Sequence, residues 1–138
     1  MTSRAPLHVS CEHELPVPPL DLPDPSVVED PEALSRSQAV ALFIQRAKAV
    51  LPGFGVDARN GPAIAALCHR LDGLPLALEL AAAGAKLLSP QALLERLTAR
   101  LDDLGGGPVD LPERQQTLRG TIAWSCDLLP AGARRLFA

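Results

Sequence analysis

Side chains that could do chemistry gather at two places in the sequence, and the first is a short run near its beginning. His8, Cys11 and His13 lie within six residues, and imidazole and thiolate are ligands that zinc prefers. Three ligands with no distant fourth are a weak match to a zinc site. Cys126, in "SCD", lacks the paired histidine that would activate a nucleophile. We therefore predict no metal site and no catalytic residue.

The second place is "DGLPLALELAAA" (residues 72–83), where Gly73-Leu74-Pro75 interrupts a run of helix-forming residues. A glycine that ends one helix and a proline that begins the next are ordinary helix punctuation. The same helix start also offers free N–H groups and a positive dipole end, beside the flat ring of Pro75, on which a purine could pack. From the residues alone, both interpretations stay open, and they are compatible.

The composition favours packed helices. Of the 138 residues, 47% are hydrophobic but only 3% are aromatic, so the core must be aliphatic. The net charge of −3 and the absence of a basic stripe argue against direct contact with nucleic acid. Three widely spaced cysteines indicate a reducing compartment. With no signal peptide and no apolar run long enough to span a bilayer, we predict a cytoplasmic protein without membrane contact.

Proline density divides the chain. Residues 15–31, here called the connector, contain "LPVPPL" and should be extended, because each proline disfavours helix in the residue before it. Residues 6–10 could form one short strand. The expected units are a remnant with the connector (1–34), a helical domain (35–104), a linker (105–112) and the start of a further domain (113–138).

Apolar spacing and capping residues predict the helices. Val40, Phe43 and Ala47 follow the i, i+3, i+7 spacing of a single helical stripe. Cys68 and Trp124 are interpreted as packing residues of their helices. The predicted helices run from Ser35 or Ser37 to about Val50, from Asn60-Gly61-Pro62 to Gly73, from Pro75 to about Leu87, from Ser89-Pro90 past Leu101, over 115–129, and onward from Pro130.

These motifs, in this order, resemble a known family. The segments are Thr2-Ser3-Arg4, "LPVPPL", "AVALFIQRAKAV", "IAALCHRLDGLPLALELAA", "LLSPQALLERL" and "QQTLRGTIAWSCDLL". Together they resemble the STAND signalling ATPases, and more narrowly the NB-ARC (AP-ATPase) module of bacterial LuxR-type and SARP-type transcriptional regulators. "GLPLALELAA" is the most specific piece. The resemblance covers essentially the whole chain.

The resemblance implies a nucleotide-dependent switch. Such modules bind ATP or ADP between a P-loop domain, an ARC-like helical domain and a winged-helix domain. It implies that Arg4 belongs to a sensor segment that reads the terminal phosphate, and that Gly73, Leu74 and Pro75 form the adenine side of the site. The fold expected is thus mainly α, a helical bundle preceded by a short strand or extended segment and followed by the start of a winged helix.

The chain also departs from that family. It contains no G-x-x-x-x-G-K-[ST] loop to hold phosphate, and no acidic strand end to hold the metal. We therefore expect a C-terminal fragment of the module, which is not an enzyme by itself and binds ADP or ATP only together with the missing P-loop domain. The alternative is a helical protein–protein interaction module that binds no nucleotide. Its exposed apolar surface would then contact another chain or a second copy.

Overall fold

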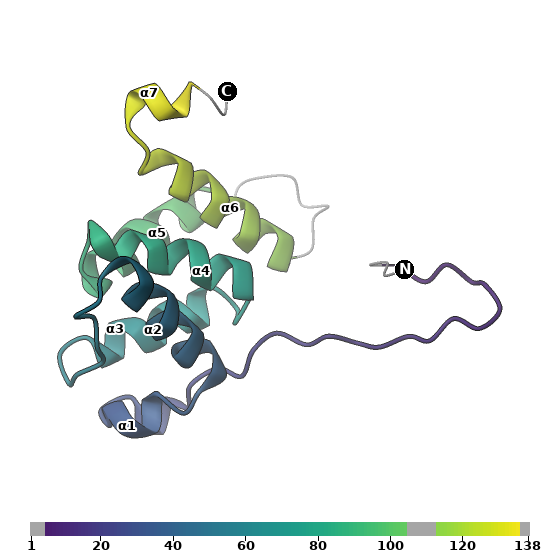
Figure 1. The fold of residues 1–138 in the computed structure, drawn as a ribbon, viewed down its shortest axis with the longest axis horizontal. Helices are drawn as coiled ribbons and strands as arrows, with labels where there is room; N and C mark the ends of the chain where they lie inside the picture. The colour runs from purple at the N-terminus through teal and green to yellow at the C-terminus, as the bar shows by residue number, and fades with distance from the viewer. Residues whose placement is uncertain (1–4, 105–112, 136–138) are drawn as a thin grey trace.

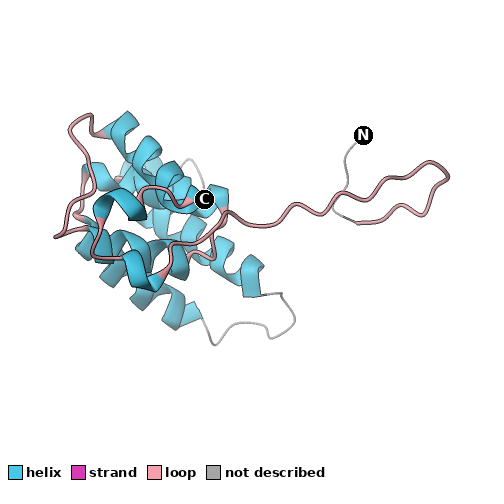
Figure 2. Ribbon diagram, turned by 90° about the horizontal axis from the view of Figure 1, so that it is seen from below, coloured by secondary structure: helices cyan, strands magenta, loops and turns pink. Residues whose placement is uncertain are grey.

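Helices make up all the regular secondary structure of the described residues, 5–104 and 113–135, in the computed structural model (Figures 1 and 2). This confirms the mainly α bundle. The elements in chain order are η1 (Pro25–Val27), α1 (Pro31–Leu34), α2 (Gln38–Val50), α3 (Gly61–Arg70), α4 (Pro75–Ala83), η2 (Gly84–Lys86), α5 (Pro90–Leu104), α6 (Glu113–Asp127) and α7 (Ala131–Arg134). No described helix has the length and apolar character that crossing a bilayer requires.

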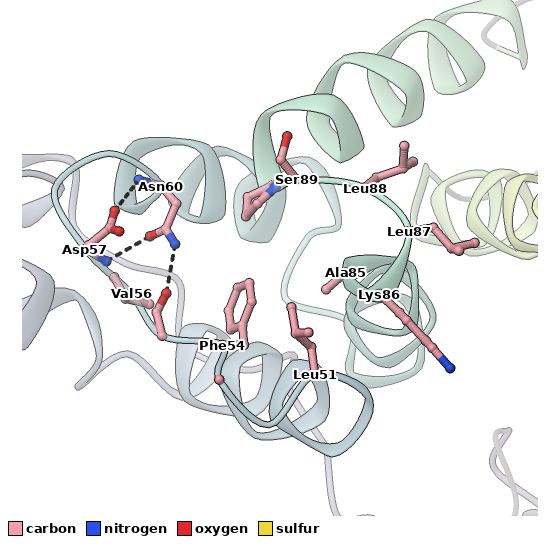
Figure 3. Close-up of a pocket in the computed structure, with 13 residues that line it drawn as sticks. Leu51, Phe54, Val56, Asp57, Asn60, Ala85, Lys86, Leu87, Leu88 and Ser89 are labelled. Atoms are coloured by element: carbon pink, nitrogen blue, oxygen red, sulfur yellow. Dashed lines mark hydrogen bonds between the residues drawn. The ribbon is translucent and has the colours of Figure 1, made fainter.

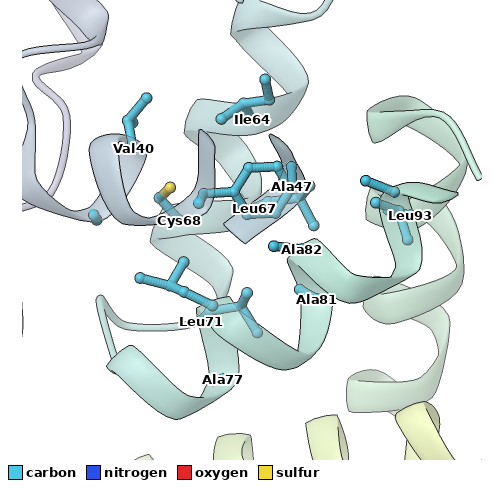
Figure 4. Packing of buried hydrophobic residues seen from close by; sticks show 14 of the residues in the cluster. Val40, Ala47, Ile64, Leu67, Cys68, Leu71, Ala77, Ala81, Ala82 and Leu93 are labelled. Atoms are coloured by element: carbon cyan, nitrogen blue, oxygen red, sulfur yellow. The ribbon is translucent and has the colours of Figure 1, made fainter. Parts of the chain in front are cut away.

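Helix α4 is the central element of the bundle. It packs against α2 on one side and α6 on the other, while α3 packs against α5 (Figure 1). Its buried residues are small and aliphatic: Ala77, Leu78, Ala81 and Ala82. Alanines on two sides of one helix let neighbouring helices approach it closely, and the larger Leu and Ile side chains of α3 fill the space between them (Figure 4). Cys68 and Trp124 lie in this core, as predicted.

Local signals placed most helix ends correctly. Helix α2 begins after Ser37, one of the two predicted caps, and α3 begins after Asn60. Helix α4 ends at Ala83, four residues earlier than predicted, and continues as the 3-10 turn η2. The tighter turn begins at Gly84, where a Cβ atom would lie 2.8 Å from Leu93 Cδ2 and 2.9 Å from Trp124 Cη2. Close packing of α5 and α6 at this glycine therefore coincides with the end of the α-helix.

The predicted strand at residues 6–10 is wrong. That segment has no strand partner among the described residues, and an isolated strand leaves its backbone groups unpaired. It forms a turn instead, in which His8 and Cys11 have φ values of 55° and 72°. The Glu12 carboxylate closes the turn by accepting hydrogen bonds from the amides of Leu7 (2.6 Å) and His8 (2.8 Å).

The connector is extended only as far as Asp24. Beyond it, η1 and α1 each begin with an Asp-Pro pair. Asp24 accepts from the Ser26 amide at 2.8 Å, and this bond holds the pKa of its carboxyl below the ordinary value. Asp30 likewise caps the amides of Glu32 and Ala33. Carboxylate caps followed by proline at the first helical position start helices, so the run expected to be extended contains the turn η1, and α1 begins at its last residue, Pro31.

Replacing Gly84 with alanine should destabilise the fold. Because the new methyl group would overlap Leu93 and Trp124, we expect the free energy of unfolding to fall by about 1–3 kcal/mol. The matched control is Gly132→Ala in α7, where a Cβ meets nothing within 4 Å. Urea denaturation followed by circular dichroism measures both variants. Equal stability of Gly84→Ala and the wild type would contradict the close packing of α6 on η2.

The buried thiol of Cys68 should resist labelling. Burial raises its pKa from 9.0 to about 12, and the thiolate is the reactive form. We expect a thiol reagent at pH 8 to modify exposed Cys11 in the native protein and to reach Cys68 only after unfolding. Because the unfolded chain ionises this thiol at lower pH than the folded chain does, stability should fall as the pH rises from about 9 toward 12. Rapid native labelling of Cys68 would contradict this placement.

Candidate functional site

The turn between α3 and α4, residues 71–74, adopts a left-handed backbone at two successive residues. Asp72 has a φ of 54° and Gly73 a φ of 63°. The Gly73 amide donates to the Cys68 carbonyl at 3.2 Å and the Asp72 amide to the His69 carbonyl at 3.1 Å, which satisfies the last carbonyls of α3. Leu74, in extended conformation, then leads directly into α4. The glycine after α3 and the proline that begins α4 therefore act as predicted from the sequence.

The connector is bonded to this turn. The Leu20 amide donates to the Gly73 carbonyl at 3.0 Å. A Cβ atom at Gly73 would lie 2.5 Å from the Leu20 carbonyl oxygen, so only glycine permits this approach. Gly73 is itself buried, and the connector packs directly on it.

Three further contacts fix the connector beside the turn. The Asp21 carbonyl accepts from the Ala39 amide at 3.1 Å and from the Ser37 hydroxyl at 2.8 Å, at the start of α2. His69 Nε2 lies 2.8 Å from the Pro23 carbonyl oxygen, at the end of α3. Residues 20–23 are thus held along one edge of the bundle, and the chain before them projects away from it (Figure 1).

Helix α6 contacts the same turn from another direction. The Thr117 hydroxyl donates to Asp72 Oδ2 at 2.9 Å, and Thr117 is only 8% exposed. Nothing in the sequence pointed to Asp72 or Thr117 as contact residues. The left-handed Asp-Gly pair is the one local signal that could have indicated a special turn, since Asp and Gly are the residues that tolerate that conformation.

The surface of the candidate site is formed by Pro75 and its neighbours. Pro75 and Leu76 are exposed and Leu74 is half-buried, so the structure brings these residues together at the start of α4. Leu74 supplies no side-chain cap, which leaves the first amides of α4 without one. Asp72 places a carboxylate on the same turn, and this negative charge favours a neutral ring there over a phosphate. Arg4, the predicted phosphate sensor, lies outside the described residues.

An open hollow of about 630 Å³ lies at the other end of α4, between the α2–α3 loop and the η2–α5 turn (Figure 3). Phe54, Val56 and Ala85 contribute apolar surface, and exposed Leu51 and Leu87 flank it. Asn60 braces the loop: its Nδ2 donates to the Gly55 carbonyl at 2.8 Å and its Oδ1 accepts from the Asp57 amide at 2.9 Å. The sequence analysis predicted no such hollow.

His8, Cys11 and His13 do not form a metal site with other described residues. Across residues 5–104 and 113–135, no three His, Cys, Asp or Glu side chains are arranged so that they could hold a metal ion. Cys11 is exposed on the projecting segment.

Comparison with curated proteins identifies relatives. Over 136 residues, 99% of this chain, the sequence is 38% identical to a protein of Mycobacterium tuberculosis named "Putative HTH-type transcriptional regulator". This chain is similar to one segment of that regulator. A protein of the same description from Mycobacterium bovis matches equally well. The chain spans 14% of the length of these relatives.

A further relative matches a shorter stretch. An uncharacterized protein of Mycobacterium tuberculosis is 38% identical over 100 residues, which is 72% of this chain and 25% of that protein. No protein-family model matches the chain. No solved structure matches it either.

Substituting Gly73 tests whether the connector packs on this glycine. Gly73→Ala forces an L-residue into the left-handed region and places a methyl group against the Leu20 carbonyl, so we expect a loss of about 2 kcal/mol or more in unfolding free energy. Gly55→Ala, where a Cβ meets nothing within 4 Å, is the matched control and should stay near wild type. Chemical denaturation measures both variants. If they were equally stable, the connector could not lie on this turn.

Proposed function

We propose that this chain is a helical segment of an HTH-type transcriptional regulator. The observation that carries the proposal is the 38% identity over 136 residues to a protein of that description. The chain spans a small part of that relative, and its net charge of −3 provides no basic surface for phosphate contacts. DNA binding would therefore be carried by other parts of such a regulator, with this bundle acting in the cytoplasm as a regulatory part.

Within that role, we propose that the bundle forms the adenine-side lid of an ADP/ATP site, as in the NB-ARC modules that it resembles. Two features support the lid. The proline of "GLPLALELAA" is exposed at the start of α4, and that helix start has no side-chain cap. A flat, uncharged purine suits this surface, because the Asp72 carboxylate on the same turn disfavours an anion. Arg4 is proposed to contact the terminal phosphate.

The proposed mechanism is a population shift. A nucleotide held between Pro75 and a P-loop domain would stabilise the closed arrangement of the two domains. Exchange of the nucleotide would release that arrangement. The 138 residues lack a phosphate-binding loop, so hydrolysis is not assigned to them. We expect the isolated chain to bind ADP no more tightly than about millimolar, because adenine contacts alone give few kcal/mol.

A second candidate function is a protein interaction module without nucleotide. The hollow flanked by exposed Leu51 and Leu87 supports it, since exposed apolar surface of this kind marks contact sites. The two candidates use opposite ends of α4. Nucleotide binding depends on Pro75, whereas partner binding would depend on Leu51 and Leu87.

Titration with fluorescent ADP tests the nucleotide proposal, in a polypeptide that carries this segment together with a P-loop domain. We expect Pro75→Ala to weaken ADP binding about tenfold, on the basis of roughly 0.8 kcal/mol for each methylene group returned to water. Pro62→Ala is the matched control, because Pro62 is an exposed proline in the first turn of α3. Unchanged affinity in Pro75→Ala, or equal loss in both variants, would remove Pro75 from the site.

A further inference from the structure

Two segments that are distant in the sequence are bonded to adjacent residues of the α3–α4 turn. The connector donates the Leu20 amide to the Gly73 carbonyl at 3.0 Å. Helix α6 donates the Thr117 hydroxyl to the Asp72 carboxylate at 2.9 Å. Neither bond belongs to the helical ladder of α3 or α4. Both the connector and helix α6 are therefore hydrogen-bonded to the same turn.

The backbone of the turn makes the two bonds interdependent. Asp72 is a non-glycine residue in the left-handed region, a conformation that costs an L-residue about 1 kcal/mol. In this conformation the Asp72 carboxylate is directed to Thr117, and the turn is held both by its amide bonds to α3 and by the Leu20 bond. If the connector leaves Gly73, the turn can relax, and the carboxylate then moves away from Thr117.

A second polar contact between α6 and the bundle is weak. The Arg100–Asp127 ion pair (3.3 Å) is partly exposed, and such pairs contribute about 0–1 kcal/mol. The buried Trp124 Nε1 has no hydrogen-bond partner among the described residues, which costs stability. Of the buried residues of α6, Thr117 and Thr121 are polar, unlike the aliphatic core around α4.

We propose that the α3–α4 turn couples the docking of the connector to the seating of α6, with Asp72 as the positioning residue. Displacement of the connector loosens α6, and by reciprocity a partner that displaces α6 loosens the connector. This coupling goes beyond the proposed function and needs no nucleotide at Pro75. Its test can therefore succeed or fail whether or not the chain takes part in an ADP site.

Hydrogen exchange of the 138-residue chain, measured residue by residue by NMR, tests the forward direction. Leu20→Pro removes the amide that bonds to Gly73 and leaves the turn sequence intact. We expect exchange of the α6 amides around Trp124 to rise about fivefold, which corresponds to the loss of one hydrogen bond of about 1 kcal/mol. The control is Leu22→Pro in the same connector, because no hydrogen bond of the Leu22 amide is seen in the described part of the chain.

The reverse direction uses an isosteric variant that is expected to fold. Thr117→Val removes the hydroxyl that bonds to Asp72, and we expect exchange of the Leu20 amide to rise about fivefold for the same reason. Thr121→Val is the control, because the Thr121 hydroxyl donates to the Thr117 carbonyl within α6 and, among the described residues, reaches neither the turn nor the connector. Exchange of the Leu67 amide in α3 should stay at the wild-type rate in both variants.

Three results would overturn the coupling. One is wild-type exchange of the Leu20 amide in Thr117→Val. Another is an equal rise in Thr121→Val, which would indicate a general loosening of α6. The last is an equal rise at Leu67, which would indicate global unfolding instead of a link through the turn.

Discussion

The arrangement of this bundle depends on the left-handed turn at Asp72-Gly73. The turn ends α3, starts α4, accepts the Leu20 amide of the connector and accepts the Thr117 hydroxyl of α6. The missing Cβ of Gly73 permits the approach of the connector, because a methyl group would lie 2.5 Å from the Leu20 carbonyl oxygen. A feature that reads as helix punctuation in the sequence is thus also the junction of three segments of the chain.

Helix α4 links this junction to the rest of the molecule. Pro75 is exposed at one end of α4, and the open hollow lies at the other, beyond Gly84. Between them, the alanines of α4 let neighbouring helices pack closely on either side. A ligand at either end would therefore act on the helix that packs between α2 and α6. This placement suits the regulatory role proposed above.

The sequence predicted those features whose causes are local. Apolar spacing and capping residues gave α2, α3 and α5, and the glycine and proline of the α3–α4 turn were found because each acts on its own backbone. The strand at residues 6–10 failed because strand formation depends on a partner strand. The bonds of Leu20 and Thr117 to the turn could not be predicted, because each joins residues 45 or more positions apart that come together only in the folded structure. The Asp-Pro pairs that start η1 and α1 are local signals as well, but they lie in the proline-rich run that was predicted to be extended.

The bond between the connector and the turn can be observed directly. NMR detects scalar coupling across a hydrogen bond, here between the Leu20 amide nitrogen and the Gly73 carbonyl carbon, which belong to groups 3.0 Å apart. We predict a resolved coupling between these two nuclei in the 138-residue chain. Absence of the coupling, with the Leu20 amide exchanging at the rate of an unstructured peptide, would contradict the central claim that the connector is held on this turn.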